Sequence, residues 1–324
     1  MNLGLILASQ SRFGEAEQAL NQAVRLAPNN IQGLSAHAMV LTRMRRRDEA
    51  IDSFRKVISL EPNSPEAHLN LGIALADQYN MQSALAEFSE AVRLSPDAAA
   101  SHYNKGRVLV DLRRNDEAKG ELMRATQLDP DSAQSWYLLG LIAKEDGDST
   151  SAVQAFEKSI AHDQSNSDAL YRLGQELVKT GDVAAAAQKW RQAIEAHPDY
   201  AEALYSLSRL LAKSSPVESR QLQSRFEKLQ AEQHLMDRAQ TLGNFALASA
   251  EARDWPQAVA QLKEGLDLCG DCSAKPLLHK DLGLIYCRSG DLKNGLAELL
   301  RAQKFSPRDP DIEQAIRVAQ SIHN

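Results

Sequence analysis

Cysteine, aromatic residues and excess positive charge are all scarce in this 324-residue chain. Only three residues are cysteine, too few for the disulfide framework that stabilises small secreted domains. Aromatic residues make up 5% of the chain, which disfavours a β-sheet protein, because strands are enriched in aromatic and β-branched side chains. Alanine and leucine, both strong helix formers, are frequent. We therefore predict an almost entirely α-helical fold.

The charge balance disfavours nucleic acid as a partner. The net charge is −6 at pH 7, whereas binding to a phosphate backbone needs a basic stripe. One dense basic run, residues 43–47 (RMRRR), is followed at once by Asp48 and Glu49. We interpret this run as a solvated turn between two helices and not as a phosphate site.

Long apolar runs are also missing. No stretch approaches the roughly 18 apolar residues that a membrane-spanning helix needs, so we expect no direct membrane insertion. Residues 3–8 make a poor signal peptide, because no positive residue precedes them and no small-residue cleavage site follows. The cytoplasm is therefore the default expectation, and an extracytoplasmic location stays open if a signal peptide lies upstream of Met1.

Three sets of residues recur along the chain with a period of 34, which is typical of a repeat protein. The positions are Pro28, Pro62, Pro96, Pro130 and Pro198; Ala16, Ala50, Ala84, Ala118, Ala152 and Ala186; and Gly72, Gly106, Gly140 and Gly174. One structural unit therefore repeats along most of the sequence.

Each period predicts two helices joined by a turn. Between residues 133 and 166, Trp136 and Gly140 keep helical spacing, a turn follows at 147–148, and Ala152 and Phe156 mark a second helix. The small residues let the two backbones approach, and the two rings fill the space beside them. The proline that ends most units blocks continuation of the second helix.

This pattern resembles the tetratricopeptide repeat family. The signature positions are filled in one unit by Leu71, Gly72, Ala84, Phe88, Ala91 and Pro96, and in a later unit by Leu173, Gly174, Ala186, Trp190, Ala193 and Pro198. The resemblance implies an all-α, right-handed superhelical solenoid of about nine helix-turn-helix repeats, forming a single array over residues 1–324. We expect the repeats near residues 1–30, 31–64, 65–98, 99–132, 133–166, 167–200, 201–238, 239–275 and 276–309, and a capping helix at 310–322.

Two places depart from the period. Between Ala186 and Ala258 the step is four residues longer than two periods, and neither glycine nor proline interrupts residues 217–242. We therefore predict an extended second helix in the seventh repeat. From Gly270 to Pro307 the step is three residues longer than one period, which predicts a lengthened loop around residues 273–275. Apart from these two places, Gly4 occupies the glycine position of a first helix, so the chain begins in the middle of that helix. We expect the sequence to be a fragment or a late start of a longer one.

The resemblance also implies that the first helices line a concave surface, which takes up extended peptides in this family. Tyrosines keep the 34-residue period on these helices, cations lie near them, and two asparagines 34 apart could pair with a peptide backbone. The candidate groove residues are Asn70, Tyr103, Asn104, Arg107, Tyr137, Lys144, Tyr171, Arg172, Gln175, Lys179, Tyr205 and Arg209. An alternative stays open, in which the tyrosines mainly support neighbouring helices.

No catalytic constellation stands out in the sequence. Three histidines, at 68, 102 and 279, fall at the packing position that Trp136 occupies, and we interpret them as half-buried packing residues. We expect no catalytic residue, no metal and no cofactor.

The segment Leu268–Cys272 (LCGDC) holds two of the three cysteines. A zinc site is disfavoured because the nearest further ligands, His279 and Cys287, lie about 12 Å apart along one helix. A redox site is disfavoured because Cys269 ends a helix, whose negative terminus opposes a thiolate. We therefore predict a turn with a possible structural disulfide between Cys269 and Cys272.

Taken together, these features predict a non-enzymatic scaffold or adaptor that binds an extended polypeptide on its concave face. The protein or peptide partner is not encoded by any motif. Two alternatives stay open: a recognition domain of a larger multidomain enzyme, such as a repeat-containing glycosyltransferase, and a thiol-disulfide oxidoreductase that uses Cys269 and Cys272.

Overall fold

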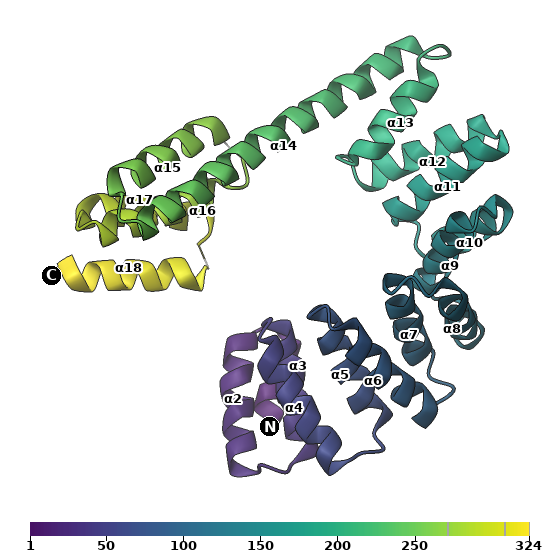
Figure 1. The fold of residues 1–324 in the computed structure, drawn as a ribbon, viewed down its shortest axis with the longest axis horizontal. Helices are drawn as coiled ribbons and strands as arrows, with labels where there is room; N and C mark the ends of the chain where they lie inside the picture. The colour runs from purple at the N-terminus through teal and green to yellow at the C-terminus, as the bar shows by residue number, and fades with distance from the viewer. Residues whose placement is uncertain (271, 308, 324) are drawn as a thin grey trace. The chain divides into compact units, whose positions relative to one another are not determined.

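The computed structural model describes residues 1–270, 272–307 and 309–323, of which residues 322 and 323 are described by their backbone alone. All regular structure in these ranges is helical (Figure 1). The helices are α1 (Asn2–Ser9), α2 (Phe13–Leu26), α3 (Ile31–Arg43), α4 (Arg47–Leu60), α5 (Pro65–Asp77), α6 (Met81–Leu94), α7 (Ala99–Asp111), α8 (Asn115–Leu128), α9 (Ala133–Glu145), α10 (Ser149–His162), α11 (Ser167–Thr180), α12 (Val183–Ala196), α13 (Ala201–Leu211), α14 (Pro216–Glu251), α15 (Trp255–Cys269), α16 (Lys275–Arg288), α17 (Leu292–Phe305) and α18 (Pro310–His323). The predicted all-α repeat fold is confirmed.

The chain divides into two compact units, Met1–Pro198 and Asp199–Asn324. The N-terminal compact unit holds α1 to α12, which are the first six predicted repeats, and the C-terminal compact unit holds α13 to α18. We describe each compact unit by itself. The sequence-based expectation of one continuous array stays a prediction.

Within the N-terminal compact unit, each repeat is a pair of antiparallel neighbours, and each second helix packs on the first helix of the next repeat. Successive first helices also contact one another directly, α3 with α5, α5 with α7 and α7 with α9. The first helices therefore form a continuous surface, and residues that recur every 34 positions on them lie side by side.

Glycine sets how closely the two helices of a repeat approach. A Cβ atom at Gly72 would lie 2.5 Å from the ring of Phe88, and a Cβ atom at Gly140 would lie 2.6 Å from the ring of Phe156. Both rings are fully buried. The bulky residue of each second helix therefore fills the notch that the glycine of the first helix leaves, as the residue pattern predicts.

Helix ends follow the capping residues in the sequence. The side chains of Asn30, Ser64, Ser132 and Asn166 accept a hydrogen bond from a backbone N–H in the first turn of a first helix. In the N-terminal compact unit, the turn inside each repeat places one residue in the left-handed region, at 11, 45, 79, 113, 147 and 181. Glycine fills this place in only two of the six repeats, so Ser11, Arg45, Tyr79 and Arg113 hold a conformation that is unusual for residues with a side chain.

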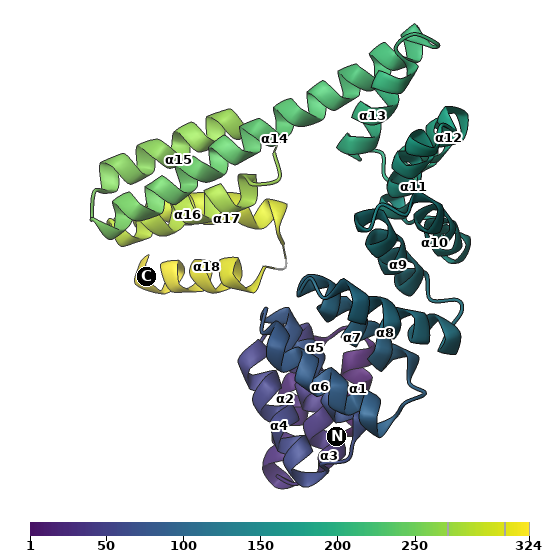
Figure 2. The same ribbon diagram turned by 45° about the vertical axis from the view of Figure 1, so that its right-hand side comes forward.

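The long helix α14 confirms the predicted extension of the second helix of the seventh repeat, but it runs past the expected end of that repeat. It runs without a break for 36 residues, from Pro216 to Glu251, so the second helix of the seventh repeat continues into the first helix of the eighth (Figures 1 and 2). The expected boundary at 238/239 therefore falls inside a helix. The physical reason is the absence of proline and of a helix-breaking turn between residues 217 and 242.

Helix α18 closes the C-terminal compact unit, as predicted from its one-sided apolar pattern. Ile312, Ile316 and Ala319 are buried in a cluster with Leu299 and Ala302 of α17. The side chain of residue 322, which belongs to the predicted capping helix, lies outside the described residues.

Candidate functional site

A groove crosses the first helices of repeats two to four, α3, α5 and α7. It has a volume of about 770 Å³ and is entirely within the N-terminal compact unit. The residues that line it are Met39, Thr42, Arg43, Arg45, Arg47, Phe54, Asn70, Ile73, Ala76, Asp77, Tyr79, Met81, Arg107 and Asp111. We call this set of residues the arginine groove. Of the residues predicted from the sequence, it contains Asn70 and Arg107.

The two predicted asparagines are not equivalent. Asn70 lines the arginine groove, whereas the side-chain amide of Asn104 donates to the carbonyl of Ala100 in its own helix, at 2.8 Å. That internal bond occupies one donor of Asn104. Of the two asparagines, Asn70 is therefore the one that lines the groove.

The four tyrosines of the predicted ladder differ in exposure. Tyr103 and Tyr137 are half-buried, and the Tyr137 ring packs 6.0 Å from the ring of Phe156. Tyr171 is only 8% exposed, because its ring packs against Trp190, where the other repeats carry smaller residues. The Tyr171 ring therefore supports helix packing, and only its hydroxyl reaches the neighbouring polar groups.

That hydroxyl joins a hydrogen-bonded network between α9 and α11. Gln175 donates from Nε2 to the Tyr171 hydroxyl at 3.0 Å, and Lys144 donates to Oε1 of Gln175 at 2.6 Å. Arg172 lies between Tyr137 and Gln175 and donates to Gln175 at 3.4 Å. The structure thus brings together five of the predicted groove residues, Tyr137, Lys144, Tyr171, Arg172 and Gln175, and most of their polar groups already have partners.

The sixth predicted residue of this region, Lys179, sits beside a buried acid that sequence reasoning missed. Glu176 has a fully buried side chain, which accepts from Ser149 at 2.7 Å and from Lys179 at 2.8 Å. A buried polar side chain needs such hydrogen-bond partners, because burial removes its contacts with water. Lys179 therefore serves the stability of α11 as well as the exposed surface.

Burial and neighbouring charges shift three pKa values on this surface. Burial raises the pKa of the Tyr103 hydroxyl, and the charge of Arg107 opposes that effect. Burial and the charge of Asp168 raise the pKa of the Tyr137 hydroxyl. Burial and the charge of Arg172 lower the pKa of Lys144. Both tyrosines are therefore neutral hydrogen-bonding groups at neutral pH.

The last two predicted residues, Tyr205 and Arg209, belong to the C-terminal compact unit. Tyr205 is 40% exposed, and its ring packs 5.1 Å from the ring of Phe226 in α14. Arg209 donates to the Tyr205 hydroxyl at 3.2 Å and lies over the ring. These two residues form one cationic and aromatic patch on α13.

Arg43, Arg45 and Arg47 are groove residues that the sequence interpretation missed. They do flank an exposed turn, between α3 and α4, but the same turn borders the arginine groove. The signal lay in the 34-residue period: Arg43, Asp77 and Asp111 hold one position of successive first helices, and Met39, Ile73 and Arg107 hold another. The period identifies groove residues of every chemical type, not tyrosines and asparagines alone.

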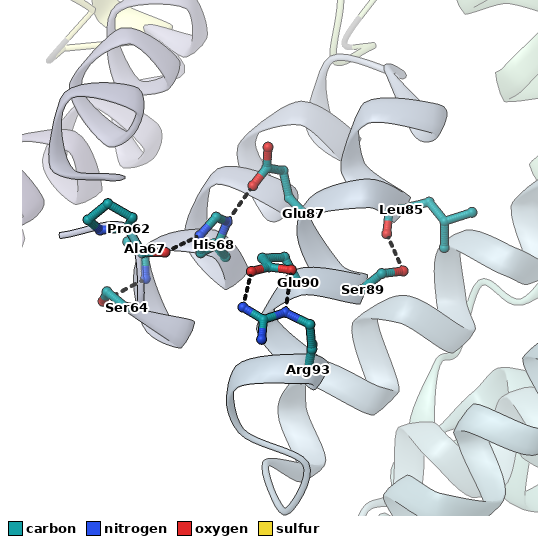
Figure 3. Close-up of polar contacts among 9 residues, drawn as sticks. All are labelled: Pro62, Ser64, Ala67, His68, Leu85, Glu87, Ser89, Glu90 and Arg93. Atoms are coloured by element: carbon teal, nitrogen blue, oxygen red, sulfur yellow. Dashed lines mark hydrogen bonds and ion pairs between the residues drawn. The ribbon is translucent and has the colours of Figure 1, made fainter. Parts of the chain in front are cut away.

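The three packing histidines are buried and hydrogen-bonded, not half-buried. His68 places Nδ1 2.6 Å from Glu87 of its own repeat and Nε2 3.0 Å from the carbonyl oxygen of Pro62, which ends the preceding repeat (Figure 3). His102 makes the same two contacts, with Glu121 and Pro96. His68 and His102 therefore each link two neighbouring repeats. Among the described residues, no group of three or more His, Cys, Asp or Glu side chains could hold a metal ion.

The contact between His102 and Glu121 gives a pH-dependent prediction. Burial alone would raise the pKa of Glu121, but hydrogen bonds from Lys105 and His102 outweigh it, and the net pKa is lowered. A carboxyl group whose pKa is lowered in the folded state stabilises the protein at pH values above its unfolded-state pKa, which is about 4.3. This stabilisation is lost as the pH falls through the folded-state pKa. We expect Glu121→Gln to lower the free energy of unfolding by about 1 kcal/mol at pH 7 and by much less near pH 3. Urea unfolding at both pH values measures this.

Glu117→Gln is the matched control, because Glu117 lies on the same helix and, within the described residues, forms an ion pair only with exposed Arg114. We expect little change from it at either pH. A loss from Glu121→Gln that is equally large at both pH values would contradict the assignment of a lowered pKa.

Cys269 and Cys272 are joined by a disulfide that spans the turn after α15. Asp271, between them, lies outside the described residues. Cys269 is the last residue of α15, as predicted, and Gly270 holds a positive φ of 55°. The negative end of a helix opposes thiolate formation, so this position disfavours a thiol-disulfide oxidoreductase.

No helix in the described ranges has both the length and the apolar character that a bilayer crossing requires.

Comparisons with known proteins agree with the repeat architecture. The family model of the Cilia and flagella-associated protein 70 C-terminal domain matches residues 27–242, about two thirds of the chain, and a Tetratricopeptide repeat model matches residues 1–30. No curated protein matches in sequence.

The solved structures that share the fold include the following two. One is PilW, described as a widely conserved type IV pilus biogenesis factor, with 21% identity over 65% of this chain and 96% of that chain and a TM-score of 0.56. The other is PilF of Pseudomonas aeruginosa, with 20% identity over 62% of this chain and 97% of that chain and a TM-score of 0.56. At these identities the likeness shows the fold alone. The family models carry the assignment: the chain is a tetratricopeptide repeat protein and belongs to the family of the Cilia and flagella-associated protein 70 C-terminal domain.

Proposed function

We propose that this chain is a non-enzymatic scaffold that binds an extended polypeptide along the first helices of its N-terminal compact unit. The arginine groove carries the proposal. It is an open groove across three consecutive repeats, and it offers an amide at Asn70, charged groups and apolar side chains together. Interfaces with peptides combine such apolar contacts with a few directed polar groups.

The same surface continues over α9 and α11 with the network of Tyr137, Lys144, Arg172 and Gln175. In this proposal Tyr137 and Arg172 are contact residues, because both are half-buried and their polar ends face the network. Tyr171 holds the network in position and contributes little exposed surface. Tyr205 and Arg209 form a separate contact patch on the C-terminal compact unit.

Site-specific photo-crosslinking tests the proposal. We expect a benzoylphenylalanine in place of Asn70 to cross-link polypeptides in cell extract, because Asn70 lines the arginine groove. The matched control carries the same group in place of Lys119, which is exposed on α8, a second helix. Capture of the same polypeptides with equal yield at both positions would contradict binding along the first helices.

A further inference from the structure

Four arginines border the arginine groove: Arg43, Arg45, Arg47 and Arg107. None of the four forms an ion pair with any residue in the described ranges. Arg46 provides a contrast within the same run, because it does not line the arginine groove and pairs with Glu17 at 3.2 Å and Glu49 at 2.6 Å. All four arginines that line the groove therefore lack a carboxylate partner within the described residues.

Arg107 also has a polar group without a hydrogen-bond partner among the described residues. Its side chain is half-buried between neighbouring repeats, and its Nε–H is buried without a hydrogen-bond acceptor. Most buried donors in folded proteins have an acceptor. A carboxylate bound in the groove would supply one, since carboxylates accept paired hydrogen bonds from a guanidinium group.

The other residues of the arginine groove restrict the chemical class of ligand that can bind there. Two carboxylates, Asp77 and Asp111, leave a net charge of +2 on the groove, in a chain whose net charge is −6. Apolar side chains lie among these charges: Met39 is 55% exposed and Tyr79 is 86% exposed. Such large exposed apolar side chains beside a charged groove are typical of contact sites for a partner.

We infer that the arginine groove binds an acidic polypeptide segment that carries apolar residues between its carboxylates. The carboxylates pair with the four arginines, the apolar residues cover Met39 and Tyr79, and Asn70 meets the peptide backbone. A continuous phosphate backbone fits less well, because Asp77 and Asp111 repel it and it would leave the apolar side chains uncovered. This inference rests on the proposed function and specifies the chemistry of the partner.

Fluorescence anisotropy of the full chain with a labelled probe tests the inference. The probe is a short peptide of glutamate and serine around one leucine. We expect it to bind the wild-type chain, and we expect Arg43→Gln/Arg45→Gln/Arg47→Gln to weaken its binding about tenfold. Added salt should weaken wild-type binding more than binding to this variant, because charge attraction is screened. All three arginines are exposed, and circular dichroism verifies that the variant folds.

The matched control is Arg25→Gln/Arg55→Gln/Arg93→Gln, which removes the same charge from exposed positions on the second helices α2, α4 and α6. We expect this variant to bind the probe as the wild type does. A peptide with lysine in place of glutamate should not bind.

Three results would overturn the inference: no binding of the acidic peptide, equal weakening by both triple variants, or equally strong competition by an RNA oligonucleotide of the same charge. The last result would mean that the site senses negative charge alone. If the acidic peptide fails to bind while the cross-linker at position 70 still captures polypeptides, the inference is wrong and the proposed function stands.

Discussion

Gly140→Ala should lower the free energy of unfolding of the N-terminal compact unit by about 1–3 kcal/mol, because it overpacks a closed interface. The new Cβ atom would lie 2.6 Å from two carbons of the Phe156 ring, far inside van der Waals contact. Phe156 has no exposed surface and is packed with Ala143 and Leu173, so its ring has no space to turn into. Urea unfolding, followed by circular dichroism and by hydrogen exchange of residues 133–162, measures the loss.

Gly120→Ala is the control for the helix propensity of alanine. Gly120 lies in α8 with nothing near its missing Cβ, so the same substitution should stabilise by about 0.5–1 kcal/mol. The opposite signs of the two substitutions separate the effect of packing from that of the backbone.

A double-mutant cycle then tests whether the loss of stability comes from the contact between Gly140 and Phe156. Phe156→Ala alone should destabilise by about 3–5 kcal/mol, since it leaves a cavity. In that background, Gly140→Ala should destabilise much less than in the wild type, because the ring that it meets is gone. Additive losses would show that Gly140 and Phe156 do not contact each other as described.

The repeat fold could be predicted from the sequence because the same pairing of a small and a bulky residue recurs along it. Gly140 and Phe156, like Gly72 and Phe88, keep the spacing that places a small residue opposite a bulky one. Caps such as Ser64 and Asn166 mark where first helices begin. The lack of glycine and proline between residues 217 and 242 predicts an extended helix in the seventh repeat. Its continuation into the eighth repeat could not be predicted, because the period counts residues between repeats and does not say whether a turn separates them.

Less of the candidate site could be predicted from the sequence, because contacts between neighbouring repeats decide which of its side chains are exposed. The tyrosine period is real, but Trp190 covers Tyr171 and removes its ring from the surface. The side-chain amide of Asn104 donates to a carbonyl of its own helix, whereas Asn70, its neighbour in the period, lines the groove. The basic run at residues 43–47, taken alone, indicates a solvated turn, because it gives no sign of the first helices that lie beside it.

A substitution in helix α14 is the second for which we expect a large loss of stability. We expect Gln230→Pro to destabilise the C-terminal compact unit by about 3 kcal/mol or more. Proline at this position removes the hydrogen bond to the carbonyl of Phe226 and clashes with that carbonyl. Of residues 224–235, all but Phe226 and Leu229 are exposed, so few side-chain contacts could hold the helix closed around the break.

Hydrogen exchange resolved along residues 216–251 measures this effect, with Gln230→Ala as the control. Alanine keeps the backbone hydrogen bond and is the strongest helix former, so the control should leave exchange unchanged or slower. The proline variant should speed exchange on both sides of residue 230, because α14 is one helix that serves two repeats: Leu222 is buried in its first half and Ala246 in its second. Faster exchange on one side alone would mean that the two halves fold as separate helices, and the seventh and eighth repeats would then be joined by a hinge at the boundary that the sequence period indicates.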